Sequence, residues 1–149
     1  MISVDTNILF ASVVPENPNH EKAAAFMDSL HSRDDIAISE FFLLELYVLL
    51  RNPAVVTRPL QSNAAVDVCQ KFRSHSRWQI VGFPLDSQAF HDDFWLRLTA
   101  RDFARRRSYD WRTALSLLRQ GVTEFATPNE KDFRDFGFKW VWNPLADQR

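Results

Sequence analysis

Hydrophobic residues follow two spacings along this chain, and the two alternate from one end to the other. Short runs of branched and aromatic residues that end at a polar residue or proline predict strands at 2–4, 36–38, 78–83, 122–126 and 138–142. Apolar residues recurring every three or four positions predict helices at 8–14, 20–30, 40–51, around 65–72, at 87–106 and from 108 to Gly121, with a short helix or turn at 128–133. This alternation predicts a three-layer α/β/α domain with a mainly parallel central sheet.

The first nine residues predict a strand, a tight turn and a helix. Ile2 and Val4 alternate with Ser3, and the strand pattern stops at Asp5. The two residues that follow, Thr and Asn, are both favourable helix N-caps. In a parallel sheet the carboxyl ends of the strands are where ligands bind. An acid at this position is poorly explained by packing, and we expect Asp5 to hold a metal ion.

Length and composition limit the range of functions. With 149 residues, 46% of them hydrophobic, the chain is expected to form a single domain spanning 1–149. The net charge of −1 means that a polyanion has to be met by a local basic patch. The single cysteine, Cys69, excludes an internal disulfide framework and a Cys-rich zinc site. No signal peptide or span of roughly 20 apolar residues is evident, so we expect a soluble cytoplasmic protein with no membrane partner.

Glu45 is the most informative single residue. It lies in an apolar helical run, Phe41 to Leu50, and no Lys or Arg occurs between Glu40 and Arg51 to pair with it. Burying an unpaired carboxylate costs several kcal/mol or forces it to be neutral. A catalytic or metal-binding role explains its presence. The alternatives are an arginine partner from elsewhere in the chain or a slit of solvent.

Asp110 and Asn129 are further candidates, each with a structural alternative. Asp110 falls in the first turn of a predicted helix, where an acid is already favoured by the helix dipole. Helix N-termini also lie near the carboxyl edge of the sheet, so this position fits a shared site. Asn129 follows the predicted strand 122–126 and is equally a helix N-cap, with Asp132 able to complete the cap.

Several carboxylates meeting at one sheet edge would repel one another unless a cation shared the site. Such repulsion raises their pKa values. Hard oxygen ligands select Mg²⁺, with Mn²⁺ as the alternative. A divalent ion at such a site binds phosphates and can lower the pKa of a water molecule for attack. The chemistry that suits this arrangement is phosphodiester hydrolysis.

A basic stretch leads directly into the segment that carries Asp110. Its arginines are Arg97, Arg101, Arg105, Arg106, Arg107, Arg112 and Arg119. In a chain with net charge −1, this local density is a candidate track for RNA phosphates, with Arg101, Arg105 and Arg112 as the expected contacts. The alternative is a solvated helix face that also carries acids such as Asp92 and Asp102.

These residues together resemble a known family, the PIN-domain ribonucleases. Residues 4–9 (VDTNIL) resemble its opening motif, 39–50 the second, 109–114 the third, 127–133 the fourth, and 141–145 the final strand and exit. The similarity covers nearly the whole chain in the family's order, and the most similar type is the VapC toxins of bacterial toxin–antitoxin pairs. Each motif alone is weak, whereas the set of motifs at these separations is specific.

The resemblance implies a Mg²⁺-dependent endoribonuclease that forms a homodimer and is inhibited by a cognate antitoxin. It places the first three acids at Asp5, Glu45 and Asp110, and the fourth position, often Asp in the family, at Asn129. By this interpretation Asp5 and Asp110 bind the metal, while Glu45 binds it or draws a proton from a water. The Asn at the fourth position puts that ligand in doubt, and Asp132 could partly replace it.

Three other functions remain open from the sequence. One is a PIN-like nuclease in RNA processing outside any toxin pair, which genomic context would distinguish. Another is a catalytically silent PIN-like domain that only binds RNA or protein, and Asn129 is its best support. The third is a phosphotransfer domain with Asp5 as nucleophile. It is disfavoured because the second residue after Asp5 is Asn7, so the Asp-x-Asp pattern is absent.

Overall fold

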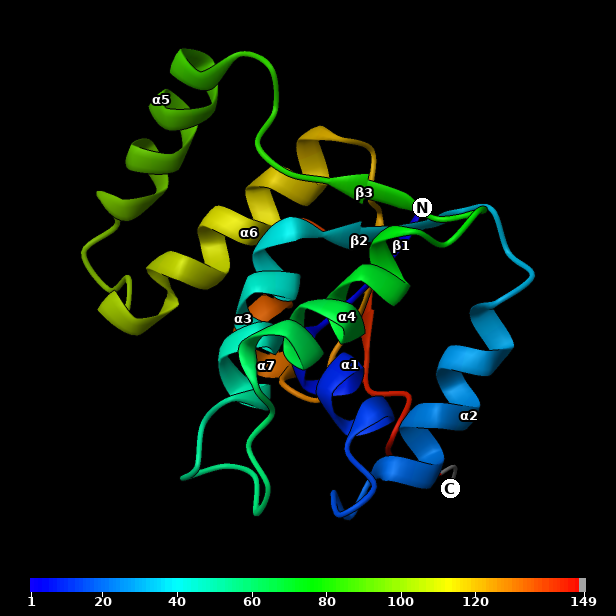
Figure 1. The fold of residues 1–149 in the computed structure, drawn as a ribbon. Coiled ribbons are helices and arrows are strands. Elements are labelled where there is room, and N and C mark those ends of the chain that lie inside the picture. Colours follow the sequence, from blue (N-terminus) through cyan, green and yellow to red (C-terminus); the bar gives the residue numbers. More distant parts are fainter. Residues whose placement is uncertain (148–149) are drawn as a thin grey trace.

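The centre of the structure is a single parallel sheet. The structure is a computed structural model that describes residues 1–147. Its strands are β1 (Ile2–Val4), β2 (Ile36–Ser39), β3 (Gln79–Val81), β4 (Glu124–Ala126) and β5 (Trp140–Trp142). The strand order is β3-β2-β1-β4-β5, and every neighbouring pair is parallel (Figure 1). The first strand of the sequence is therefore the central strand of the sheet.

Helices cover both faces of this sheet. They are α1 (Thr6–Val13), α2 (His20–Leu30), α3 (Glu40–Leu50), α4 (Ser62–Arg73), α5 (Ser87–Leu98), α6 (Ser108–Arg119) and α7 (Glu130–Phe133), with a 3-10 turn η1 (Arg105–Arg107) before α6. The strands step outward from β1 through β2 to β3, and the chain then returns to the other side of β1 for β4 and β5. The helices before β3 pack on one another, α1 on α2 and α3, and α3 on α4, while α6 packs on α5 and α7 after it. The predicted three-layer α/β/α domain with a parallel sheet is confirmed.

The strand order reverses between β1 and β4, and the position outside the carboxyl ends of these two strands is called the crevice below. Ile2 of β1 lies opposite Ile36 of β2, and Val4 lies opposite Ala126 of β4. The Asp5 N–H donates to the Ala126 carbonyl at 2.9 Å, so the pairing of β1 with β4 continues one residue beyond the strand. Ligand crevices form outside the carboxyl ends of strands where the strand order reverses. Asp5 stands at that point, between β1 and β4.

Aromatic packing fixes β4 beside this crevice. Phe125 of β4 is fully buried. Its ring centroid lies 5.7 Å from that of Phe42 on α3, 4.6 Å from Phe133 on α7 and 5.2 Å from Phe138. Aromatic pairs of this kind stabilise a fold beyond the area that they bury. The elements that flank the crevice are thus joined through one well-packed cluster.

The predicted helix at 87–106 is wrong in its second half. α5 ends at Leu98, and the hydroxyl of the next residue, Thr99, donates to the Leu96 carbonyl at 2.7 Å. The chain has to turn back here because α6 packs against α5. The hydrophobic pattern nevertheless continues past this turn, since Phe103 packs against the core from the connecting segment.

Other local predictions differ from the structure mainly in their ends. β3, β4 and β5 are shorter than predicted, at three residues each. Cys69 is buried, as its place on the apolar side of its helix predicts. No helix in the described part of the chain combines the length and apolar character needed to cross a membrane.

Two leucines on α3 offer a test of the packing. Leu46 is fully buried, whereas Leu44, two residues earlier, is 63% exposed. We predict that Leu46→Ala lowers the free energy of unfolding by about 2–5 kcal/mol, because it loses apolar contacts and leaves a cavity. Leu44→Ala should change it by no more than about 0.5 kcal/mol. Urea unfolding followed by circular dichroism measures both, and equal losses would contradict the packing of α3.

Candidate active site

The turn between β1 and α1 fixes the carboxylate of Asp5. Its Oδ1 accepts a hydrogen bond from the Asn7 N–H at 3.2 Å, and its Oδ2 accepts one from the Thr127 hydroxyl. Asp5 is thus the N-cap of α1, and the prediction of Thr6 or Asn7 as the cap was wrong by one or two residues. The reason is that the chain at Asp5 is still extended, with its side chain already turned toward the helix. Only 5% of Asp5 is exposed, so this carboxylate has little freedom to leave the crevice.

Glu45 reaches from α3 toward the start of α1. Its Oε2 accepts a hydrogen bond from the Thr6 hydroxyl at 2.8 Å. The residue is exposed, although the apolar run around it predicts burial. The reason is that α3 leaves part of its apolar surface uncovered, including Leu44 and Val48. Of the alternatives left open by the sequence, contact with solvent is the one that the structure shows.

Asp110 reaches the crevice from the first turn of α6, where it is half-buried. The pKa of its carboxyl is raised, first by burial and then by the charges of Asp132 and Asp5. The charges of Arg107 and Arg106 oppose this shift. Asp110 therefore lies within electrostatic reach of an acid on β1 and of another on α7.

The other two acids have raised pKa values as well. For Asp5, loss of hydration on burial is the largest cause and outweighs the hydrogen bonds from Thr127 and Asn7, which favour the charged form. For Glu45, partial loss of hydration raises the pKa, the Thr6 hydrogen bond lowers it, and the charges of Asp5 and Asp110 raise it further. Since Asp5 acts on both Glu45 and Asp110, the three carboxylates share one electrostatic environment.

None of these three acids has a basic partner at ion-pair distance within residues 1–147. Other acids of the chain do. Glu40, also on α3, lies 2.8 Å from Arg73, and this pair explains its presence without a site role. The arginine partner that the sequence left open for Glu45 is therefore not observed, and the crevice keeps an excess of negative charge.

Asn129 is placed differently from the three acids. It is exposed, and its side chain lines a hollow on the α1 side together with Asn7. It occupies the N-cap position of α7, but its side chain makes no capping hydrogen bond. Its backbone N–H instead donates to Oγ1 of Thr127 at 3.0 Å. The acid of this segment whose charge reaches the site is Asp132, which raises the pKa of Asp110.

The site also includes two threonines that the sequence analysis did not identify as candidates. The Thr6 hydroxyl holds Glu45, and the Thr127 hydroxyl holds Asp5. Thr127 is fully buried, which is unusual for a residue at the start of a loop. The available signal was position, because Thr127 directly follows the strand that pairs with β1. Its partner lies more than one hundred residues away in the chain, however, and no local pattern predicts that contact.

The donor atoms at this crevice suit a hard divalent cation. Within residues 1–147, no group of three or more His, Cys, Asp or Glu side chains has the spacing of a complete metal-ligand set. Mg²⁺ does not require one, because it keeps several waters and is bound through one or two carboxylates. Burial raises the pKa values of all three acids, repulsion adds to the shift at Glu45 and Asp110, and a nearby cation would favour the charged forms. The residues present therefore fit Mg²⁺ or Mn²⁺.

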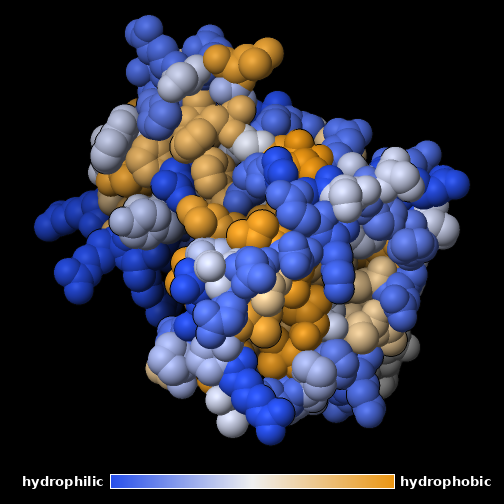
Figure 2. All heavy atoms as spheres, viewed as in Figure 1, coloured by the Kyte–Doolittle hydropathy of each residue, from blue (hydrophilic) through white to orange (hydrophobic). Residues whose placement is uncertain are grey.

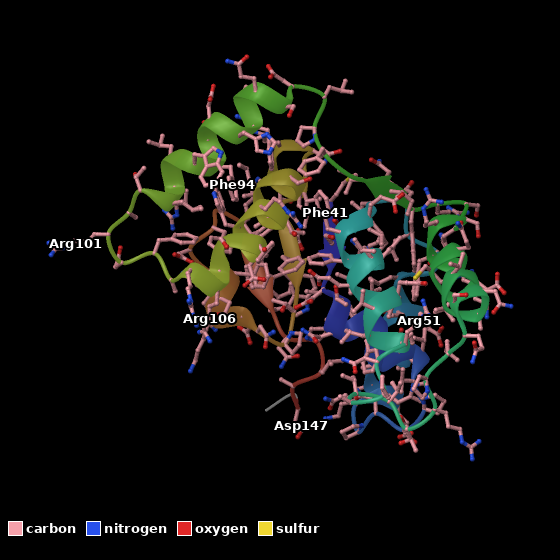
Figure 3. The ribbon with its side chains drawn as sticks, turned by 60° about the vertical axis from the view of Figure 1, so that its left-hand side comes forward. Phe41, Arg51, Phe94, Arg101, Arg106 and Asp147 are labelled. Atoms are coloured by element: carbon pink, nitrogen blue, oxygen red, sulfur yellow. The ribbon has the colours of Figure 1, made fainter. Side chains whose placement is uncertain are left out.

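The basic stretch divides into paired and free arginines. Ion pairs to acids involve Arg97, Arg106, Arg107 and Arg119. In the part of the chain that the structure describes, Arg101, Arg105 and Arg112 form no such pair. Figure 3 shows Arg101 in the connection between α5 and α6, pointing outward, and Arg106 beside the start of α6. Figure 2 shows strongly hydrophilic side chains projecting from this side of the molecule.

Solved structures of similar fold include a toxin–antitoxin complex from Klebsiella pneumoniae, with a TM-score of 0.59 at 17% identity, covering 97% of this chain and 98% of that one. A structure of FitAB bound to a DNA fragment matches with a TM-score of 0.66 at 18% identity, covering 100% of this chain and 99% of that one. The structure of VapBC2 from Rickettsia felis, bound to a DNA fragment from its promoter, matches with a TM-score of 0.66 at 19% identity, covering 96% and 98%. At these identities the matches establish the fold.

Sequence comparison identifies the family. No family model matches the chain. Ribonuclease VapC24 of Mycobacterium tuberculosis, however, is 46% identical over 146 residues, which cover 98% of each chain. Identity of this extent, together with the fold, shows that the chain belongs to the VapC family of PIN-domain ribonucleases.

Proposed function

We propose that this protein is a Mg²⁺-dependent endoribonuclease and the toxin of a toxin–antitoxin pair. The main support is the crevice at the end of β1, where burial raises the pKa values of Asp5, Glu45 and Asp110 and none of them has a basic partner at ion-pair distance among the described residues. If these acids had only a structural role, we would expect basic partners for them or uncharged residues in their place, because unpaired acids that lose hydration destabilise a fold. The cost is explained if the acids bind a cation during catalysis.

Asp5 and Asp110 are the proposed direct ligands of the ion. Bound Mg²⁺ would supply stabilisation of the charge that develops on the phosphate, together with a lowered pKa for the attacking water. Asp5 is suited to bind because two hydrogen bonds already fix its carboxylate. Asp110 comes from a different element, the first turn of α6. We propose Asp132, rather than Asn129, as the residue that assists Asp110 in binding the ion, because its charge reaches Asp110.

Glu45 is the proposed general base. Its side chain is exposed and so can meet a water molecule, while the Thr6 hydroxyl keeps one oxygen in a fixed position. The raised pKa makes its carboxylate a stronger base than an ordinary glutamate. The free oxygen accepts the proton of the attacking water, and the bridging oxygen of the RNA leaves from the other side of the phosphorus.

RNA would reach this crevice past the start of α6. Arg101 and Arg105 are exposed, and each lacks an ion-pair partner within residues 1–147. They can therefore bind phosphates along the strand without first breaking an internal contact. The paired arginines of the same stretch would have to give up an acid, which makes them weaker candidates.

An antitoxin and a second copy of the chain are the proposed protein partners. The structural neighbours include a toxin–antitoxin complex from Klebsiella pneumoniae, which supports the first of these partners. On this chain Leu44 and Val48 are exposed on either side of Glu45 along α3, and with Leu49 they line an apolar hollow. A partner that covers this surface would also block access to the general base. Burial of exposed apolar side chains next to the site is a simple means of inhibition.

The first prediction from this proposed function concerns activity. Purified protein with Mg²⁺ should cleave single-stranded RNA, and EDTA should abolish the cleavage. Asp5→Asn should lower the rate by about 10²-fold or more, because the amide removes a charge from the metal site. Asp92→Asn, the same change at an exposed position of α5, should have no effect. Cleavage that survives EDTA or Asp5→Asn undiminished would end the proposal.

The second prediction concerns stability against pH, without metal. The pKa of Glu45 is raised in the folded protein, so its charge destabilises the fold above that pKa and has no effect where the carboxyl is protonated in both states. Glu45→Gln, which keeps an acceptor for Thr6, should raise the melting temperature in EDTA at pH 7. The gain should shrink as the pH falls and disappear below about pH 4. Thermal melts at several pH values measure this, and a gain that does not depend on pH would contradict the assignment.

Added Mg²⁺ gives a further readout that does not require turnover. It should raise the melting temperature of the wild-type protein at pH 7, since an ion that binds only the folded state stabilises it. The increase should be smaller in Glu45→Gln and in Asp5→Asn. The same increase in all three proteins would place the ion elsewhere.

The third prediction concerns the toxin role. Expression in bacterial cells should arrest growth, Asp5→Ala should abolish the arrest, and co-expression of the product of the neighbouring gene should restore growth. Western blotting of the variant checks that it accumulates to the same level. Normal growth despite an active enzyme in vitro would favour an RNA-processing nuclease outside a toxin pair.

A further inference from the structure

Arg112 differs from the other arginines near the site in how its charge is satisfied. Its Nε, like that of Arg97, is buried and has no hydrogen-bond partner within residues 1–147, but Arg97 is paired with Asp135. Arg112 lacks an ion pair in this part of the chain, in contrast to Arg107 and Arg119 on either side of it in the sequence. A buried N–H group without an acceptor is costly and calls for an explanation.

Two aromatic rings hold the guanidinium of Arg112. Its Cζ lies 4.8 Å from the ring centroid of Phe41 and 5.5 Å from that of Tyr109. Phe41 is itself supported by Phe83, whose ring packs edge-on at 4.7 Å. Figure 3 shows Phe41 between α3 and α6. Contact with ring faces fixes the position of a guanidinium while leaving N–H groups at its edge able to donate.

The place where Arg112 is held is next to the catalytic acids. Phe41 and Glu45 are four residues apart on α3 and so lie on the same side of that helix. Asp110 is two residues before Arg112 on α6. The charge of Arg112 reaches Glu45 and lowers the pKa of its carboxyl, although the two form no ion pair. A positive charge is thus kept beside the acids without being neutralised by any one of them.

We propose that Arg112 is a catalytic residue that binds the phosphate at which the RNA is cut. Its N–H groups would donate to the non-bridging oxygens, and the planar guanidinium matches two such oxygens at once. An RNA phosphate entering a crevice lined by carboxylates is repelled, and a cation held in place beforehand offsets that repulsion. This role rests on the proposed ribonuclease function. It is distinct from the roles of Arg101 and Arg105, which are exposed and bind the strand outside the crevice.

Kinetics of matched variants test the assignment. Arg112→Met keeps the length of the side chain but removes the charge and the donors, and it should lower kcat about 10²-fold. Arg112→Lys should recover part of that loss, because it restores the charge without the paired donors. Arg119→Met, the same change on the same helix at an arginine bound to Asp93, should leave kcat within threefold of wild type. A kcat for Arg112→Met within threefold of wild type would overturn the proposal.

RNA binding without turnover gives an independent readout. In an Asp5→Asn background, adding Arg112→Met should weaken the binding of a fluorescent single-stranded RNA about tenfold. It should also reduce the slope of log affinity against log salt by about 0.7, the value for one lost phosphate contact. Adding Arg119→Met should change neither. Unchanged affinity and slope, together with a shifted pH–rate profile, would show that Arg112 acts only on Glu45 and would refute phosphate binding.

The two measurements separate this proposal from the one on which it rests. If the wild-type protein cleaves no RNA, the ribonuclease function fails, and Arg112 as a catalytic residue fails with it. If the wild type is active and both Arg112 readouts are unaffected, only the role of Arg112 is lost. Should Arg112→Met lower the melting temperature strongly, Arg112→Lys decides the question. It keeps the charge and stem and should still lower kcat at least threefold, and a rate equal to wild type would refute paired binding.

Discussion

The burial of carboxylates that have no basic partner is the constraint on which the rest of this structure depends. Asp5, Glu45 and Asp110 lie on different segments of the chain. Burial raises the pKa of each, and the charge of Asp5 raises the pKa values of the other two further. Within the described residues the fold supplies no cation at ion-pair distance to cancel this. A compact domain of this size has only about 5–15 kcal/mol of net stability. It can therefore keep such a cluster only if the surrounding packing is strong and the cluster is needed.

The packing around the crevice meets that requirement through the central strand. β1 is buried along its length, paired on both sides, and followed at once by Asp5. The hydroxyls of Thr6 and Thr127 then fix Glu45 and Asp5 by donating hydrogen bonds to their carboxylates, without adding a charge to the site. These hydrogen bonds favour the ionised carboxylates and partly offset the loss of hydration. The result is a rigid set of acids that stay ionised more readily than burial alone would allow.

Much of this arrangement could be predicted from the sequence, and the exceptions have physical causes. The strand that ends at Asp5 and the helix that carries Glu45 each have a local hydrophobic pattern, so their positions follow from spacing. The exposure of Glu45 could not be predicted in this way. An apolar helix is buried on all sides only where other elements cover it, and part of α3 is left uncovered. The contact between Thr127 and Asp5 joins distant parts of the chain and depends on which strands pair. The end of α5 depends on tertiary contact with α6, which overrides a pattern that continues to Phe103.

The distribution of arginines resolves an apparent conflict between the charge of the chain and its proposed substrate. A protein with net charge −1 and an acidic crevice should repel RNA over most of its surface. Arg107, paired with Asp135, also has its guanidinium 4.4 Å from the ring of Phe136, so it serves to anchor the segment before α6. Arg112 is held by aromatic rings instead of acids, and its charge is therefore not cancelled by a neighbour. An arginine paired with an acid thus serves the fold, whereas one without an acidic partner keeps its charge available to a phosphate, and total charge does not distinguish the two.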